Sequence, residues 1–78
     1  MSINEELNKQ ELINAMNRFR DMKKLYLSLP QKYEDEKIKL KTTISEIITR
    51  IKDNPVFDSV STIDERDEIE SFLTNLEV

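Results

Sequence analysis

The chain has 78 residues, of which 36% are charged and 37% hydrophobic, and its formal net charge is −4. It contains no histidine, cysteine or glycine. These absences exclude the common zinc-ligand sets, the Ser-His and Cys-His nucleophile pairs and the glycine-rich turns that bind phosphates. We therefore expect one small, non-enzymatic domain (residues 1–78) with no metal or cofactor.

The composition also bears on location and fold class. Without cysteine there is no disulfide and no reason to expect an oxidising compartment. The N-terminus is acidic where a signal peptide would be basic, and no apolar run approaches the roughly 20 residues that cross a bilayer. We expect a cytoplasmic protein without membrane contact. The lack of glycine argues against an all-β fold, because hairpin turns depend on it.

Residues 3–28 are predicted to form the first helix. Ser2 and Glu5 have the spacing of a capping box at its start, and Pro30 ends or kinks it. Apolar residues recur on one face at steps of three and four, with Lys23 at one of the positions: Leu12, Met16, Phe19 and, after Lys23, Tyr26. The phase changes before Leu12, so we expect the first two turns to diverge from this face.

Residues 31–53 are predicted to form the second helix. Its apolar face runs through the isoleucines of its second half: Ile44, Ile47, Ile48 and Ile51. A strand would alternate apolar and polar residues, but Ile47 and Ile48 are adjacent. Asn54 is predicted to end the helix in the left-handed conformation, with Pro55 blocking its continuation.

Two arrangements of these helices are open: an antiparallel hairpin that turns at Leu29–Pro30, or one long helix kinked there. The hairpin is favoured because each half carries its own apolar face. Antiparallel pairing would then place Phe19 beside Leu40 and Met16 beside Ile44. Lys23 and Lys37 interrupt the two faces at nearly one level, either to disfavour other registers or simply as exposed residues.

The third predicted helix covers residues 63–76 and begins at a capping box of Thr62 and Glu65. Its apolar face consists of Ile69, Phe72, Leu73 and Leu76. In the connection before it, Val56, Phe57 and Val60 are expected to pack against the open end of the hairpin. The predicted fold is all-α: a helical hairpin of coiled-coil type with a shorter C-terminal helix, forming a three-helix or dimeric bundle.

Charge is divided unevenly along the chain. Residues 1–52 carry eleven basic and eight acidic side chains, a net charge of +3, whereas residues 53–78 carry one basic and eight acidic, a net charge of −7. The possible partner-binding residues of the third helix are acidic: Asp64, Glu65, Asp67, Glu68 and Glu70. They could dock on a basic partner or form a solvated face, and three of them (Asp64, Asp67, Glu68) could hold a hard cation.

A basic set lies toward the hairpin turn: Arg18, Arg20, Lys23, Lys24, Lys32, Lys37, Lys39 and Lys41. Acidic neighbours and the net negative charge make nucleic-acid binding the less favoured interpretation and a solvated face the favoured one. Tyr26 and Tyr33 either form an exposed contact at the turn or close the end of the hairpin core.

The third helix is about half as long as the hairpin and cannot cover both long helices. The uncovered apolar residues near the turn are further candidate partner-binding residues: Met22, Tyr26, Leu27, Tyr33 and Ile38. We therefore predict a protein–protein interaction module, such as an adaptor, regulator or assembly subunit, that forms a homo-oligomer. The alternative is an inhibitor encoded by a phage or mobile element, whose acidic third helix mimics phosphate charge and blocks a host nucleic-acid-binding protein.

Overall fold

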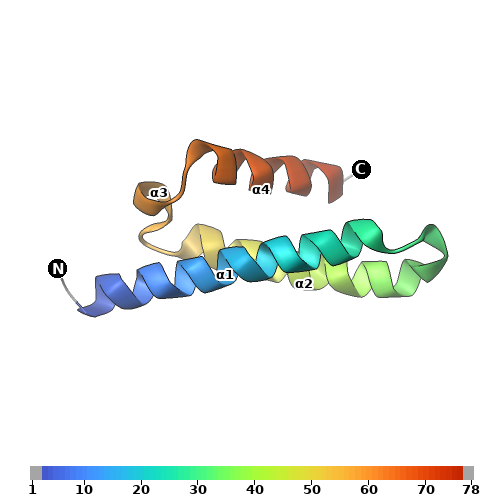
Figure 1. The fold of residues 1–78 in the computed structure, drawn as a ribbon, viewed down its shortest axis with the longest axis horizontal. Helices are drawn as coiled ribbons and strands as arrows, with labels where there is room; N and C mark the ends of the chain where they lie inside the picture. Colours follow the sequence, from blue (N-terminus) through green and yellow to red (C-terminus); the bar gives the residue numbers. More distant parts are fainter. Residues whose placement is uncertain (1–2, 77–78) are drawn as a thin grey trace.

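The computed structural model describes residues 3–76 and the side chains of residues 4–75. Its elements are α1 (Ile3–Ser28), a single 3-10 turn η1 (Gln31–Tyr33), α2 (Glu34–Asp53), α3 (Phe57–Val60) and α4 (Ile63–Leu76) (Figure 1). No strand occurs within residues 3–76. The predicted all-α fold, a hairpin of two long helices with a shorter C-terminal helix, is confirmed.

The turn of the hairpin lies at Pro30, and the single kinked helix is excluded. Pro30 has an extended backbone (φ −63°, ψ 156°), and its carbonyl accepts a hydrogen bond of 3.0 Å from the Tyr33 N–H. Proline lacks the N–H that would continue α1 and suits the first turn of a new helix. The first three residues of the predicted second helix are therefore a 3-10 turn. At the other end of α1, the predicted Ser2 cap lies outside the described residues.

The predicted left-handed end of α2 at Asn54 is wrong. Asn54 is extended (φ −67°, ψ 126°), because Pro55 excludes helical conformations from the residue before it. The Asn54 side chain instead donates 2.9 Å to the Asn8 carbonyl of α1 and accepts 3.0 Å from the Val56 N–H. This asparagine ties the open end of the hairpin together.

The core lies between α1 and α2 and continues under α3 and α4. Its buried apolar side chains are Leu12, Met16, Phe19, Ile44, Ile47, Ile48, Ile51, Val56, Phe57, Ile69 and Phe72. Leu7, by contrast, is exposed, as expected from the phase change in the first turns of α1.

The connection to α4 contains the one-turn helix α3. Val56 and Phe57 are buried as predicted, but Val60 is exposed, so its predicted packing is wrong. Ser61, the next residue, takes the inward position, and its hydroxyl donates to the Phe57 carbonyl. Val60 is 38% exposed and borders a small pocket beside Leu12 and Met16 of α1.

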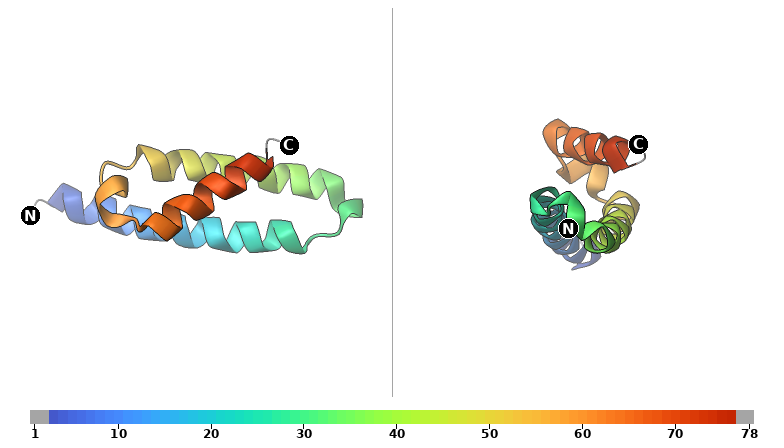
Figure 2. Two further views of the ribbon diagram at one scale, coloured as in Figure 1. Left: turned by 90° about the horizontal axis from the view of Figure 1, so that it is seen from above. Right: turned by 90° about the vertical axis from the view of Figure 1, so that its right-hand side faces the viewer.

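The α4 helix crosses one side of the hairpin obliquely and leaves the other side uncovered (Figure 2). Its Phe72 ring packs edge-on against Phe19 and Tyr26 of α1, with centroid distances of 5.8 Å. Ile69 is buried and Leu73 is half-buried, as predicted, whereas the Leu76 side chain lies outside the described ones. Fourteen residues span about 21 Å of a molecule 49 Å long, so α4 covers less than half of its length.

Candidate functional site

Three of the five predicted acidic binding residues of α4 form ion pairs with the hairpin. Glu65 accepts 2.9 Å from the Arg20 guanidinium, and Glu68 accepts 3.0 Å from the Lys23 ammonium. On the α2 side, Glu70 pairs with Lys52. Acidic α4 therefore complements the basic hairpin within one chain, and only Asp64 and Asp67 of the five remain exposed without an ion pair.

Glu65 and Thr62 form the predicted capping box at the start of α4. The Thr62 N–H donates 2.9 Å to the Glu65 carboxylate, and the Glu65 N–H donates 3.1 Å to the Thr62 hydroxyl. The hydrogen bond from the Thr62 backbone, aided by the Arg20 guanidinium, lowers the pKa of the Glu65 carboxyl below its usual value, although partial burial opposes the shift. The ionised form is thus the one that the fold stabilises.

The two lysines that interrupt the apolar faces are both half-buried and partnered. The Lys23 ammonium lies 5.9 Å and 6.0 Å from the ring centroids of Phe19 and Phe72 while it pairs with Glu68. The Lys37 ammonium lies 4.9 Å from the Tyr26 ring centroid and donates 3.4 Å to the Leu29 carbonyl. Cation–π contact and hydrogen bonding allow each charge to lie beside the core.

The predicted residues near the turn divide into packed and exposed members. Tyr26 is half-buried against Phe72 and Lys37, and Met22 is half-buried beside the core. Leu27, Tyr33 and Ile38 are exposed, and so is Leu25, which was not predicted. We call the apolar residues around the turn the tip surface: Met22, Leu25, Leu27, Tyr33 and Ile38.

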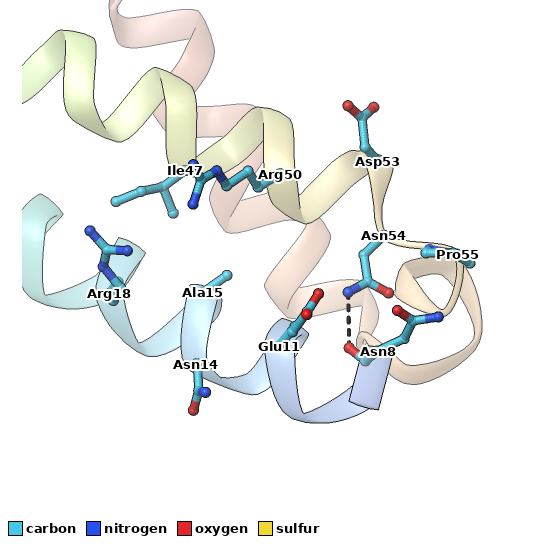
Figure 3. Close-up of a pocket in the computed structure, with 10 residues that line it drawn as sticks. All are labelled: Asn8, Glu11, Asn14, Ala15, Arg18, Ile47, Arg50, Asp53, Asn54 and Pro55. Atoms are coloured by element: carbon cyan, nitrogen blue, oxygen red, sulfur yellow. Dashed lines mark hydrogen bonds between the residues drawn. The ribbon is translucent and has the colours of Figure 1, made fainter. Parts of the chain in front are cut away.

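A groove of about 600 Å³ lies at the open end of the hairpin, between α1 and α2 (Figure 3). Its lining residues are Asn8, Glu11, Asn14, Ala15, Arg18, Ile47, Arg50, Asp53, Asn54 and Pro55, none of them from α4. Half-buried Ala15 and buried Ile47 supply apolar surface between the polar edges. We call it the open groove.

Two arginines extend toward each other across the open groove. The guanidinium groups of Arg18 on α1 and Arg50 on α2 lie near Ile47, whereas the Asp53 carboxylate is directed away (Figure 3). Within residues 3–76, neither arginine makes an ion pair or a side-chain hydrogen bond. The carboxylates of Glu11 and Asp53 also border the groove, but no ion pair neutralises either arginine. An anionic group placed between the two guanidiniums would be stabilised.

The sequence did not predict the open groove. Arg18 belongs only to the broad basic set, and no local pattern marks Arg50, Ala15 or Ile47 as binding residues. A usable signal exists in the pairs Arg18/Arg20 and Arg50/Lys52, because residues two apart on a helix lie on opposite sides.

Other kinds of site have no support in the described part of the chain. No group of three or more acidic residues within residues 3–76 lies close enough to hold a metal ion. Across the same residues, no helix is long and apolar enough to cross a membrane. In comparisons with protein-family models, curated proteins and solved structures, nothing matches this chain.

Proposed function

We propose that this chain is a non-enzymatic helical module for protein–protein interaction, and that it self-associates through the tip surface. The observation that carries the proposal is the concentration of exposed apolar side chains around the turn. Leu25, Leu27, Tyr33 and Ile38 fall within 14 residues and supply half of the eight exposed large hydrophobic residues among the side chains described. Leu25 and Leu27 lie on opposite sides of α1, so these side chains surround the turn end of the hairpin rather than form one flat patch. A concentration of exposed apolar side chains at one end of a molecule often marks an interface.

The size of the protein supports the same proposal. A domain of 78 residues buries only about 60% of its unfolded surface, so its own core supplies limited stability. A two-fold interface would cover the tip surface of both copies at once. The lack of histidine and cysteine supports a non-enzymatic role, and the lack of cysteine also fits the cytoplasm as the proposed compartment.

The inhibitor hypothesis receives less support. A mimic of phosphate charge needs carboxylates that are free to meet a basic partner, yet Glu65, Glu68 and Glu70 pair with the hairpin. Asp64 and Asp67 alone offer a small negative surface.

Light scattering coupled to gel filtration tests self-association. We expect the wild-type chain at micromolar concentration to elute at twice the monomer mass of 9.3 kDa or more. The double variant Leu27→Glu and Ile38→Glu should return to the monomer mass, because it places charge in the tip surface. A wild-type mass of 9.3 kDa throughout the micromolar range would contradict the proposal.

Ile63→Glu is the matched control. Ile63 is 69% exposed, comparable with Leu27 at 65%, but it lies at the start of α4. We expect this variant to keep the oligomeric mass. An equal loss of mass in the control would show that charge alone, rather than the tip surface, governs association.

A further inference from the structure

We propose that the open groove is a second docking site, which receives an acidic amphipathic helix of a partner protein with its carboxylates between Arg18 and Arg50. This inference rests on the proposed interaction function and names the chemistry of its partner. It uses a different part of the molecule from the tip surface, since the groove lies at the opposite end of the hairpin (Figures 1 and 3).

The hairpin presents the same kind of basic edge on both of its sides. Arg20 and Lys52 lie on the covered side, where they pair with Glu65 and Glu70 of α4. Arg18 and Arg50 lie two residues before them, about 200° around each helix, and line the open groove. Toward α4, α1 therefore offers Arg20 and Lys23, and α2 offers Lys52. Each long helix also offers one arginine to the side that α4 leaves free.

The docking of α4 shows what such a side accepts. Ile69 and Phe72 are buried against the hairpin, and glutamates beside them reach basic residues of both α1 and α2. The open groove repeats this combination with Ala15 and Ile47 between Arg18 and Arg50. The packing of α4 on the covered side is thus one instance in which this hairpin binds an acidic amphipathic helix.

The arginines favour carboxylates as the contacting groups. A guanidinium donates two parallel hydrogen bonds to one carboxylate, so two converging guanidiniums can hold one or two acidic side chains. The Glu11 carboxylate extends into the groove from α1 (Figure 3), so it repels a ligand that is anionic along its whole length. This carboxylate disfavours a nucleic-acid backbone and sets the direction of a helix whose acidic residues meet the two arginines.

A synthetic peptide of residues 62–76, acetylated and amidated, serves as the probe against the full-length chain. In the full-length chain, α4 already occupies the covered side of the hairpin. Binding of the peptide therefore reports on the open groove. In ¹H–¹⁵N NMR titration we expect shifts at the backbone amides of Ala15, Arg18, Ile47 and Arg50. Shifts confined to Arg20, Lys23 and Lys52 would mean exchange with the resident α4 and would overturn the proposal.

Charge-neutral variants sharpen the test. Arg18→Gln with Arg50→Gln should weaken peptide binding by about tenfold or more, because it removes charge-assisted hydrogen bonds. Arg20→Gln, the matched control on the covered side, should leave binding at the groove unchanged or stronger. A peptide with glutamine at positions 65, 68 and 70 should bind the wild-type chain weakly. Its affinity should be no higher than that of the wild-type peptide for the double variant. Equal affinity of wild type and double variant would overturn the proposal.

The light-scattering mass separates this inference from the proposed self-association. A chain that is monomeric but binds the peptide at Arg18 and Arg50 contradicts self-association and supports the groove. An oligomeric chain that does not bind the peptide contradicts only the groove. We expect the double variant at Arg18 and Arg50 to keep the wild-type mass, since neither residue belongs to the tip surface.

Discussion

At the scale of single residues, the Glu65 carboxylate makes two different contacts. It caps the first turn of α4, and it pairs with a residue of the hairpin. One carboxylate oxygen accepts from the Thr62 N–H, and the other accepts from Arg20. A negative charge in the first turn also interacts favourably with the helix dipole. The same side chain therefore stabilises the helix locally and fixes its position on α1.

We predict that Glu65 makes stability depend on pH. Its folded-state pKa is lowered, so its contribution to stability is present above the unfolded-state pKa of about 4.5 and is lost as the pH falls through the folded-state pKa. At pH 7, Glu65→Gln should lower the free energy of unfolding by up to about 1 kcal/mol, because glutamine can keep the capping-box hydrogen bond but loses the charge that interacts with Arg20 and the helix dipole. Urea denaturation at about pH 3 should show the gap between wild type and variant largely closed.

Asp67→Asn is the control for this measurement. Asp67 is exposed on the same helix and forms no ion pair within the described residues, so its substitution should change stability little at either pH. A gap between wild type and Glu65→Gln of equal size at both pH values would show that ionisation of Glu65 is not the cause.

Single residues also show where the sequence predicts well and where it fails. The capping box of Thr62 and Glu65 was predictable because both of its hydrogen bonds lie within four consecutive residues. The left-handed prediction for Asn54 is wrong because Pro55 restricts the residue before it to extended backbone, and this restriction outweighs the general tolerance of asparagine for the left-handed region. Its bond to Asn8 joins residues far apart in the chain, and no local pattern announces it.

At the scale of elements, α2 carries the most continuous part of the core. Ile44, Ile48 and Ile51 are almost completely buried, and Ile47 is 5% exposed. These residues face α1 and the C-terminal helices, so α2 connects all parts of the core. The prediction of helix over strand for this isoleucine-rich segment is confirmed.

We predict that Ile44→Asp abolishes the fold. Ile44 is 0% exposed, so an aspartate there leaves a buried carboxylate without a partner. The expected loss of several kcal/mol is comparable with the whole stability of a small domain. Circular dichroism should show loss of most of the helical signal at 25 °C.

Ile38→Asp is the control on the same helix. Ile38 lies six residues earlier and is 54% exposed, so this substitution should preserve the helical signal. If both variants kept their helical signal, Ile44 would not be the packed core residue that the structure describes.

Element boundaries were predictable because strong local signals mark them. Pro30 ends the first helix region, and the capping box starts α4, so the spans 3–28 and 63–76 match the structure. The rotation of α4 about its own axis was not predictable in the same way. Several of its faces carry acidic residues, and only packing on the hairpin selects Glu65, Glu68 and Glu70 as the paired ones.

At the scale of the whole molecule, the net positive hairpin and the net negative α4 attract each other within one chain. Three cations of the hairpin meet three glutamates of α4. The pairs are partly exposed, and such pairs contribute about 0.2–1 kcal/mol each. Ile69 and Phe72 supply the apolar share of the attachment.

We predict that salt loosens α4 selectively. Raising the ionic strength from about 0.01 M to 1 M shortens the screening length from roughly 30 Å to 3 Å and weakens all three pairs. Backbone amides of α4 should exchange hydrogen several-fold faster, whereas amides around Ile44–Ile48 should change little.

The triple variant Arg20→Gln, Lys23→Gln and Lys52→Gln controls this experiment. Its α4 amides should already exchange fast at low salt and should respond little to added salt. A wild-type protein in which exchange rises equally in α2 and α4 would show that salt acts on global stability rather than on the α4 attachment.

The open groove shows the limit of sequence analysis at this scale. The predicted helix lengths indicate that α4 is too short to cover the hairpin. They do not indicate which side of the hairpin remains uncovered. That side follows from the path of residues 54–62, which brings α4 onto the face of Arg20 and Lys52. Only then do Arg18 and Arg50 become neighbours on a free surface.

The short connection through α3 has the effect of a tether. Because Val56 and Phe57 anchor it in the core, α4 stays beside the hairpin at a high effective concentration, of millimolar order for short linkers. A free acidic helix would have to exceed that concentration to displace α4 from the covered side, but it meets no such competitor at the open groove. If the proposed docking holds, the tether therefore favours the open groove over the covered side as the place where a partner helix binds.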